Sequence, residues 1–414
     1  MRINPSIIYQ RIKKDNITKH KLFGITVFKI KKTTRYKKKY ICGLRISKRR
    51  IYSTHILNSF SGISTGGDTF RFGIKLKGGL GDILIGINYL NYIVKTLPKE
   101  NIIIDVYAHR NLQLVTSLLP ADNFINGIYL DDAISDNGND KYDLFVVLNR
   151  YPDVRRKDMD RIYAFCPDLI DFVHACEKWR LENIRIFNHL PVCDGESNYI
   201  SEILNKKRIQ QPDIYNLFDV KESFSYELNL DETAINRFNQ LGLKPNKFIT
   251  IHRGIDDRQV KNSVKLWPFN FYNALVKLIK EEYPSIKIVQ LGINAERCPE
   301  FDGVDLNLVG KTSLEDVKVL LKNSLIHIDG EGGFVHLRHA LNGGKSVVIF
   351  GPTSPAFYGY AENLNLRGNG CSEPCEWIIN NWQAFCCRGY SKVPCMYSLT
   401  PEFVFRNIKN AMEK

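Results

Sequence analysis

The sequence predicts a mixed α/β protein that consists of two successive α/β halves. Strand-like runs alternate with helix-like runs, and glycine-rich turns separate them. The alternation starts near residue 68 and starts again after residues 242–245. Since such an alternation favours a mostly parallel sheet with helices on its faces, each half is expected to contain one such sheet.

In the first half, residues 70–76 form an apolar run typical of a buried strand. Residues 83–97 carry apolar side chains at helical spacing and predict a helix. Further strands are expected at 102–107 and 143–148. Residues 150–235 are harder to interpret: they contain helical stretches and a polar region near 191–216.

The second half repeats the pattern with strands and then helices at regular intervals. Its predicted strands are 248–252, 286–291, 324–328 and 346–350. Its predicted helices are 270–283, 313–323 and 333–342. A last helix is expected at 401–413, where Thr400 and Pro401 suit the N-cap and first helical position. The predicted domains are therefore a basic extension, an N-terminal domain, a C-terminal domain and a terminal helix, at 1–67, 68–240, 241–400 and 401–414.

The positive charge is confined to the start of the chain. Residues 1–50 hold 17 Lys and Arg and one acid, Asp15, whereas the other 364 residues hold 41 bases and 43 acids. Two β-prone stretches, 21–29 and 40–48, are flanked by cations. Such a segment could lie on an anionic lipid surface, form a solvated tail, or bind nucleic acid. Nucleic acid is disfavoured, because no recognition motif is present and the rest of the chain is nearly neutral.

Membrane insertion and export are not expected. No apolar run approaches the roughly 18 residues that a spanning helix needs, and the N-terminus lacks the apolar core of a signal peptide.

A glycine-rich turn follows the first predicted strand. It spans residues 77–82 and ends in Asp82. Its glycines allow a ligand to approach the backbone, and the N-terminus of the next helix favours anions. Asp82 could cap that helix or act as a general base in the crevice at the sheet edge.

Cations and a second glycine-rich turn follow the strands of the second half. Arg253 and Lys265 come after the strand at 248–252, and they suit a diphosphate that must be neutralised as it leaves. Residues 329–337 then lead from a strand into a helix. The pair of glycines, Gly332 and Gly333, can expose backbone N–H groups to a phosphate, and His336 lies one turn further on.

Taken together, these motifs resemble glycosyltransferase family 9, the heptosyltransferases of lipopolysaccharide synthesis and their protein-modifying relatives. The motifs are GGLGD, KLWP, GKTSLEDV, EGGFVHL and FGPTSP, at 78–82, 265–268, 310–317, 331–337 and 350–355. The resemblance extends over residues 70–412. It implies a GT-B fold, in which two Rossmann-like domains face each other across a cleft. It also implies an inverting transfer from a nucleotide-sugar without an obligatory catalytic metal.

The resemblance assigns roles to individual residues. Asp82 matches the catalytic carboxylate, and Lys265 matches the lysine at the donor phosphates. The pyrophosphate turn corresponds to Gly332, Gly333 and His336, whereas Glu331 stands where many members have Asp. The resemblance also implies a carboxylate at the ribose, Glu296, and a nucleobase pocket formed by Thr312, Ser313 and Leu314. We add Arg253 as a donor-binding cation from its charge alone.

Five of the ten cysteines fall within 25 residues near the C-terminus. In a protein that is not exported, such a cluster favours a metal over disulfides, although reduced cysteines without metal are the alternative. Four thiolates suit structural zinc or iron, and some protein heptosyltransferases of the family hold a cysteine-bound iron in this region. The expected ligands are Cys371, Cys375, Cys387 and Cys395, with Cys386 as the spare thiol.

The sequence therefore predicts a glycosyltransferase that uses ADP-heptose or another nucleotide-sugar. The acceptor would be a hydroxyl of a glycolipid, a lipopolysaccharide or a protein, and a homo-oligomer is compatible with the family. Residues 1–50 would bring the enzyme to the inner face of the cytoplasmic membrane, and no nucleic-acid partner is expected. The alternatives are a non-catalytic adaptor with a basic arm and an NAD(P)-binding enzyme. The latter is disfavoured because Leu84 stands in place of the third glycine of the dinucleotide fingerprint.

Overall fold

The structure is a computed structural model. It describes residues 9–14, 17–22, 25–32, 36–41, 44–50 and 68–412, and within the last range it leaves out 99, 109–111, 120–124, 131–132, 136–137, 139, 149–151, 183–227, 255–262, 294–297, 372–373 and 377–381.

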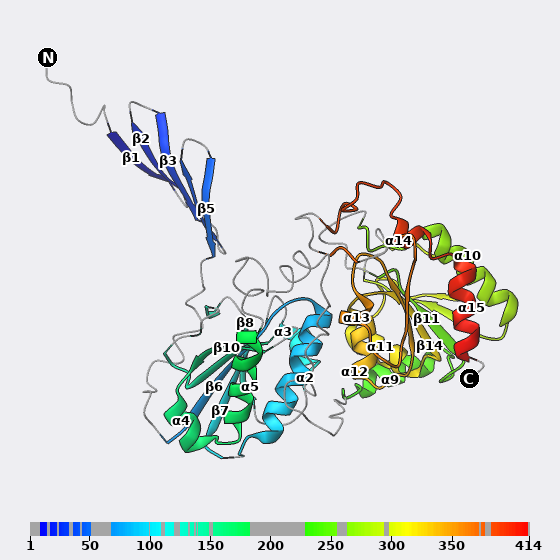
Figure 1. Cartoon of the computed structure of the whole chain (residues 1–414), viewed down its shortest axis with the longest axis horizontal. Helices are drawn as coiled ribbons and strands as arrows, with labels where there is room; N and C mark the ends of the chain where they lie inside the picture. The colour runs from blue at the N-terminus through cyan, green and yellow to red at the C-terminus, as the bar shows by residue number, and fades with distance from the viewer. Residues whose placement is uncertain are drawn as a thin grey trace.

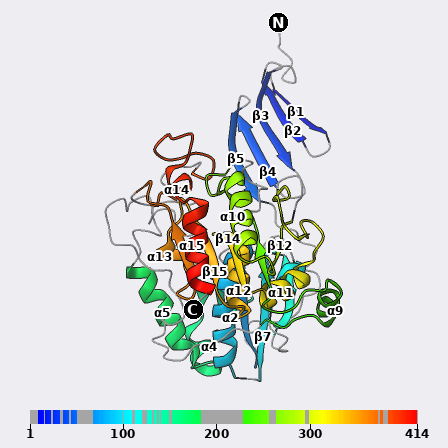
Figure 2. The same ribbon diagram turned by 90° about the vertical axis from the view of Figure 1, so that its right-hand side faces the viewer.

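The basic N-terminal segment contains five strands, which stand apart from the rest of the chain (Figures 1 and 2). Each strand pairs antiparallel with the next, in the order β1-β2-β3-β4-β5. Their bounds are Tyr9–Lys14, Ile17–Leu22, Ile25–Lys32, Tyr36–Ile41 and Leu44–Arg50. The two β-prone stretches of the sequence fall on parts of this sheet.

The first α/β half is built on a five-stranded sheet of order β10-β9-β6-β7-β8. All neighbours are parallel except β10, which is antiparallel to β9. The strands β6 to β10 span Phe70–Leu76, Ile102–Ala108, Ile125–Leu130, Leu144–Leu148 and Pro152–Lys157. The central strand β6 is buried along its whole length, as expected for a strand with helices on both sides.

The second half is a six-stranded parallel sheet of order β13-β12-β11-β14-β15-β16. In chain order, β11 to β16 span Phe248–Ile251, Lys287–Gln290, Leu306–Asn307, Ile326–Gly330, Ser346–Phe350 and Leu364–Arg367. Side chains alternate between its faces: Ile249 and Ile251 join the core beneath α10 and α15, whereas Phe248 joins the core that faces the first half.

The helices complete the layers. In the first half they are α2 (Leu80–Thr96), α3 (Leu112–Thr116), α4 (Met159–Phe165) and α5 (Leu169–Glu182). The helix α9 (Glu232–Gln240) precedes the predicted domain boundary after residue 240 but packs against α11 of the second half. The helices of the second half are α10 (Phe269–Glu282), α11 (Leu314–Asn323), α12 (Gly333–Ala340), α13 (Pro355–Tyr358), α14 (Pro394–Tyr397) and α15 (Pro401–Met412). The C-terminal α15 packs beside α10 (Figure 1).

One continuous apolar core joins the two halves. It contains Ile74 of the first sheet, Ile83 and Ile87 of α2, and Phe334 and Leu337 of α12. In Figure 1, α2 accordingly lies between the first sheet and α12. The halves are thus held against each other by buried apolar surface, which contributes about 25 cal/mol per Å².

The α/β fold class with two mostly parallel sheets is confirmed. In the two α/β halves, the strands that the sequence did not predict are β8, β10, β13 and β16, which are the edge strands of the sheets and carry partly exposed side chains. Among the helices of the described residues, none is long and apolar enough to cross a bilayer.

Candidate active site

The first turn leads from the end of β6 into α2. Gly78 has a φ of 105°, and a Cβ there would come within 2.2 Å of the Asp82 side chain, so both the backbone and the space require glycine. Asp82 Oδ2 accepts a hydrogen bond of 2.7 Å from the backbone N–H of Gly79. The carboxylate therefore does cap α2, and the cap bond fixes it in the first turn of the helix.

The second turn leads from β14 into α12. Glu331 follows β14, Gly332 is the N-cap of α12, and His336 is buried one turn into the helix. A Cβ on Gly332 would lie 2.7 Å from the carbonyl oxygen of Gly254, so the turn that begins at Arg253 packs against this one through the backbone. Two neighbouring strand ends of the sheet thus present their turns side by side.

The two glycine-rich turns meet where the halves contact each other. A Cβ on Gly81 would lie 2.4 Å from Cδ2 of His336, and a Cβ on Gly333 would lie 2.8 Å from Cβ of Leu80. Side chains at these glycines would therefore push α2 and α12 apart. The glycines allow the N-termini of the two helices, with Asp82 and His336, to come together.

Burial favours the neutral form of His336. Burial lowers the pKa of His336, and although the nearby carboxylates of Asp82 and Glu331 act in the opposite direction, the pKa stays below its usual value. Lys265 adds to the lowering, because a second positive charge nearby disfavours an imidazolium. His336 is therefore suited to donate a hydrogen bond rather than to supply a charge.

Lys265, which precedes α10 in the chain, lies beside the turn between β14 and α12. Its Nζ atom is 2.5 Å from Oε2 of Glu331 and 6.0 Å from the ring centre of Trp382. Arg253 lies in the adjacent turn, with its guanidinium 5.6 Å from the ring centre of Phe269. The structure thus brings Lys265, Glu331, the glycine pair and His336 together, with Arg253 beside them.

The predicted nucleobase residues lie at the start of α11, after β13. Ser313 is the N-cap of this helix, and its hydroxyl accepts a hydrogen bond from the backbone N–H of Asp316. Thr312 and Leu314 flank it in sequence. Glu296, the predicted ribose contact, lies outside the described residues.

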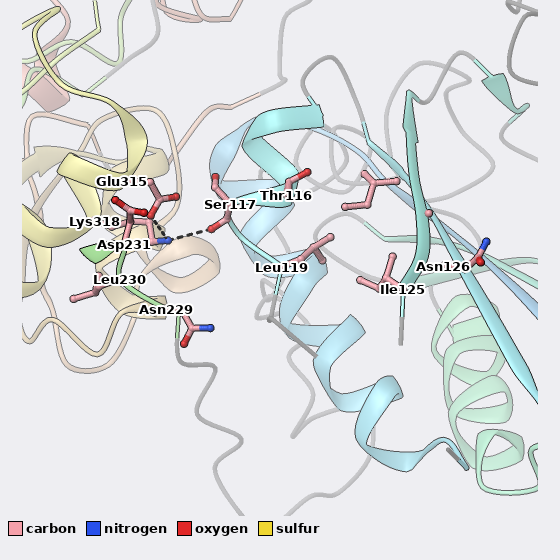
Figure 3. Close-up of a pocket in the computed structure, with 12 residues that line it drawn as sticks. Thr116, Ser117, Leu119, Ile125, Asn126, Asn229, Leu230, Asp231, Glu315 and Lys318 are labelled. Atoms are coloured by element: carbon pink, nitrogen blue, oxygen red, sulfur yellow. Dashed lines mark hydrogen bonds and ion pairs between the residues drawn. The ribbon is translucent and has the colours of Figure 1, made fainter. Parts of the chain in front are cut away.

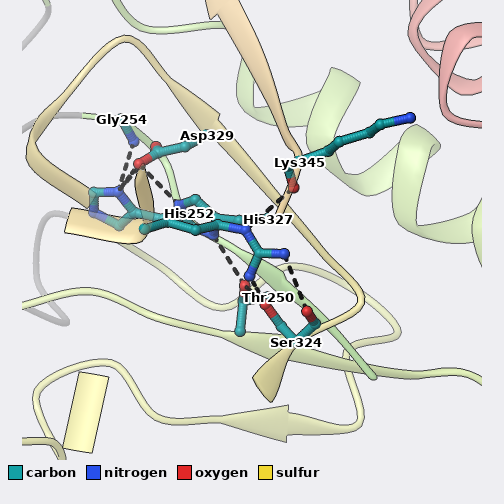
Figure 4. Close-up of polar contacts among 8 residues, drawn as sticks. Thr250, His252, Gly254, Ser324, His327, Asp329 and Lys345 are labelled. Atoms are coloured by element: carbon teal, nitrogen blue, oxygen red, sulfur yellow. Dashed lines mark hydrogen bonds and ion pairs between the residues drawn. The ribbon is translucent and has the colours of Figure 1, made fainter. Parts of the chain in front are cut away.

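A buried polar network lies behind the turns, and sequence analysis did not find it (Figure 4). Asp329 is fully buried; its carboxylate lies 2.9 Å from Nδ1 of His252 and 3.3 Å from Nε2 of His327. His327 Nδ1 contacts the Thr250 hydroxyl at 3.0 Å, and Thr250 in turn donates to Ser324 Oγ. Burial alone would raise the pKa of Asp329, but the two histidines lower it to about 2.

This network supports the turns directly. His252 precedes Arg253, Asp329 is separated from Glu331 by Gly330, and the ring of His252 lies 4.6 Å from that of Phe334 in α12. The signal in the sequence is a polar residue near the end of each buried strand, but the pairing of residues 77 positions apart became visible only in the fold.

A cavity lies elsewhere along the contact between the halves (Figure 3). It has a volume of about 740 Å³, and its lining includes Ser117 from the first half and Asp231, Glu315 and Lys318 from the second. Lys318 Nζ bridges the halves by donating to the Ser117 carbonyl and to Glu315. Asp82, Lys265 and His336 do not line this cavity, so it is not the place where they would act.

The predicted cysteine ligands lie near one another. Cys371, Cys375 and Cys395 are buried, and Cys387 is partly buried. The Cys375 thiol interacts with Cys387, and burial together with this contact raises its pKa. Arg367 donates to the carbonyl of Cys371. The donors suit a soft metal, but within the described part of the chain no group of three or more metal-binding side chains is close enough to hold an ion.

Solved structures with this architecture show what kind of fold it is. A glycosyltransferase of family 9 from Veillonella parvula is 14% identical, covers 85% of this chain and 99% of its own, and has a TM-score of 0.51. The iron-containing dodecameric glycosyltransferase TibC from enterotoxigenic E. coli is 12% identical, with coverages of 91% and 82% and a TM-score of 0.52. TibC in complex with ADP-D-beta-D-heptose is 10% identical, with the same coverages and a TM-score of 0.50.

The fold is therefore that of the two-domain GT-B glycosyltransferases, and the paired turns lie where its halves meet. The model of glycosyltransferase family 9 (heptosyltransferase) matches residues 217–377. The resemblance shown by the motifs is thus confirmed over these residues, and the match supports a heptosyltransferase-like glycosyltransferase. Among curated proteins no match is found.

Replacing Gly81 by Ala tests the contact between the turns. Because the new Cβ would lie 2.4 Å from the His336 ring, we expect the free energy of unfolding to fall by about 1–3 kcal/mol, as for other overpacked sites. Urea denaturation measures the effect. Gly79→Ala is the matched control in the same turn, since its Cβ would meet just the Asp82 carboxylate at 3.8 Å. Equal stability of the two variants would contradict the proposed close contact.

Proposed function

We propose that this chain transfers heptose from ADP-heptose to a hydroxyl group, with inversion at the anomeric carbon. The observation that supports this most directly is the contact between the N-termini of α2 and α12, which brings Asp82 to His336. The resemblance to glycosyltransferases indicates the type of reaction, the transfer of a sugar from a nucleotide-sugar. Heptose and ADP are supported by the description of the matching family and by TibC, whose structure holds ADP-D-beta-D-heptose.

In the proposed step, Asp82 is the general base. The acceptor oxygen attacks the anomeric carbon from the face opposite the diphosphate, and its proton passes to the Asp82 carboxylate. The bond from the anomeric carbon to the phosphate oxygen breaks at the same time, and the electron pair leaves with ADP. The bond from Gly79 N–H holds the carboxylate in place for this transfer.

The second half would stabilise the leaving diphosphate. The N-terminus of α12 offers backbone N–H groups after Gly332, and Lys265 supplies a positive charge. An ammonium group has three N–H donors, so Lys265 can keep its bond to Glu331 and also contact a phosphate. The proposal assigns this neutralisation to protein groups, without an obligatory catalytic metal.

The remaining assignments extend this arrangement. Residues 68–240 would bind the acceptor, and residues 241–400 would bind the donor. Thr312, Ser313 and Leu314 would meet the nucleobase and Glu296 the ribose, while Arg253 would add charge beside the diphosphate. Like TibC, which is dodecameric, the chain could act as a homo-oligomer.

Asp82→Asn tests the catalytic assignment. An amide keeps the size of the side chain and its ability to cap the helix, but it cannot take a proton. We expect the transfer rate to fall by about 10²–10⁴-fold, the usual range for loss of a general base, with little change in the affinity for ADP-heptose. Transfer is measured by ADP release and affinity by calorimetry.

The control is Asp158→Asn, which alters another aspartate that caps a helix, at the start of α4. It should leave transfer unchanged. Normal turnover in Asp82→Asn would contradict the role of Asp82.

A thermal-shift comparison of ADP-, GDP-, UDP- and dTDP-sugars identifies the donor, and no response to any of them would favour the non-catalytic adaptor.

The cysteine cluster is proposed to hold a structural iron or zinc ion. Cys371, Cys375, Cys387 and Cys395 supply four soft donors, and TibC is iron-containing. The partly buried Arg367 beside the cluster would offset part of the negative charge of four thiolates. Since three of these side chains do not yet lie within reach of a common ion, metal binding would draw the segment around Cys387 inward.

Elemental analysis of the purified chain tests this proposal. We expect about one iron or zinc per chain, and Cys395→Ser should lower the metal content severalfold and also lower the melting temperature, because a structural metal contributes directly to folding. Cys386→Ser, which changes the neighbour of Cys387, should retain the metal. A metal content near zero in protein prepared without chelators would rule the site out.

The basic N-terminal segment is proposed to bind the anionic inner face of the cytoplasmic membrane, where a glycolipid acceptor would be available. Lys and Arg near such a surface contribute about 1 kcal/mol each, and residues 1–50 carry 17 of them. The other acceptors of the sequence analysis, lipopolysaccharide and protein hydroxyls, remain alternatives for the same site.

Deletion of residues 1–50 tests the membrane role. Binding to vesicles with about one third anionic lipid should fall at least tenfold, because the cations are lost, while the affinity for ADP-heptose should not change. Sedimentation with vesicles measures the first effect, and neutral vesicles are the control. If the truncated and full chains bind equally, the charge of the segment has another purpose.

A further inference from the structure

Tyr360, a residue of the second half, contacts the imidazole ring of His336. The Tyr360 hydroxyl lies 2.6 Å from Nδ1 of His336, and the two rings meet edge to face. Tyr360 follows α13 in the chain, and its carbonyl accepts hydrogen bonds from the backbone of Asn363 and the side chain of Asn365. The hydroxyl is therefore held in a fixed position against one nitrogen of the imidazole.

The direction of this hydrogen bond follows from the chemistry of the two groups. Burial raises the pKa of Tyr360, so the phenol keeps its proton. Within the described part of the chain, His336 Nδ1 is the one hydrogen-bond partner of this hydroxyl. A buried O–H group donates if an acceptor is present, so Tyr360 donates to Nδ1. A neutral imidazole that accepts at Nδ1 carries its hydrogen on Nε2.

Nε2 faces the other half of the protein. It lies 3.1 Å from the position of a Cβ on Gly81, next to Asp82 in the first turn of α2. The titratable groups that act on the ring are Asp82 on α2, Glu331 at the second turn, Lys265 beside it, and His339 on α12. The N–H group therefore points to the place where the diphosphate and the acceptor are proposed to meet.

Tyr360 is itself supported from its other side. The ring of His339 stacks on the Tyr360 ring at 3.6 Å with an angle of 7°. Nδ1 of His339 lies 2.6 Å from the Glu362 carboxylate. Burial alone would raise the pKa of Glu362, but this contact lowers it. The order from the surface inward is thus Glu362, His339, Tyr360 and His336.

We propose that Tyr360 is a positioning residue, which fixes His336 as the tautomer with hydrogen on Nε2 so that it donates a hydrogen bond to the leaving diphosphate. His339 and Glu362 hold the Tyr360 ring in place. This inference rests on the proposed transfer reaction for its purpose, but the tautomer itself can be observed without any turnover.

Nuclear magnetic resonance of ¹⁵N-histidine-labelled protein tests the tautomer directly. In the full chain, His336 should show an unprotonated Nδ1 and a protonated Nε2 at neutral pH. Tyr360→Phe removes just the hydroxyl, and the signals should then shift toward a mixture of tautomers. Tyr358→Phe is the matched control, because its hydroxyl donates to Glu376 instead. A protonated Nδ1 in the full chain, or signals unchanged by Tyr360→Phe, would overturn the proposal.

Kinetics with a second substitution separate positioning from a structural role. His336→Gln places an amide N–H near the position of Nε2 and needs no partner at Nδ1. Tyr360→Phe should therefore lower kcat/KM for the donor roughly tenfold or more in the His336 protein, as is seen for outer partners of metal-bound histidines, but less than twofold in the His336→Gln protein. Equal losses in both backgrounds would overturn the positioning role. If the tautomer is as expected but no nucleotide-sugar is used, the proposed function fails and the tautomer assignment stands.

Discussion

The contact between the N-termini of α2 and α12 is the constraint on which the rest of the structure depends. A helix N-terminus carries a partial positive charge, so two of them side by side repel each other unless negative charge lies between them. Asp82 supplies one such charge, and a diphosphate would supply more. The apolar core that joins the halves offsets the repulsion, and glycines at 81 and 333 let the backbones approach. The arrangement is therefore most favourable with an anion at this point.

Buried charges keep the turns of the second half in place. Asp329 would be costly to bury alone, but two histidines contact it, and a satisfied polar network fixes a unique geometry. At the other end of the same sheet, the fully buried Arg338 donates to Ser324 and to the carbonyl of Lys345. Removing one partner of a buried charged contact costs more free energy of folding than the intact contact contributes. These groups therefore define the positions of the strands and of the turns that follow them.

Local signals in the sequence predict the largest part of the fold. Strands such as β6 and β15 are buried on both faces and read as apolar runs, and the motifs at their ends were assigned correctly to strand-helix turns. The edge strands β10 and β16 are partly exposed, so their composition does not separate them from loops. The approach of Gly81 to His336 depends on how two halves dock, and the pairing of His252 with Asp329 depends on strand order. Neither leaves a pattern in a single sequence, and the same holds for Tyr360.

The neutral state of His336 matters for Asp82. An imidazolium next to a carboxylate would form an ion pair, and the paired carboxylate would be a weaker base, because an adjacent positive charge favours its ionised form. Burial prevents this by lowering the pKa of His336, and the Tyr360 hydroxyl occupies the nitrogen that would take the second proton. Lys265, by contrast, is already paired with Glu331, so its charge is partly compensated on the second half. The site thus separates its roles: the positive charge stays at the phosphate turn, and the imidazole that faces Asp82 is uncharged.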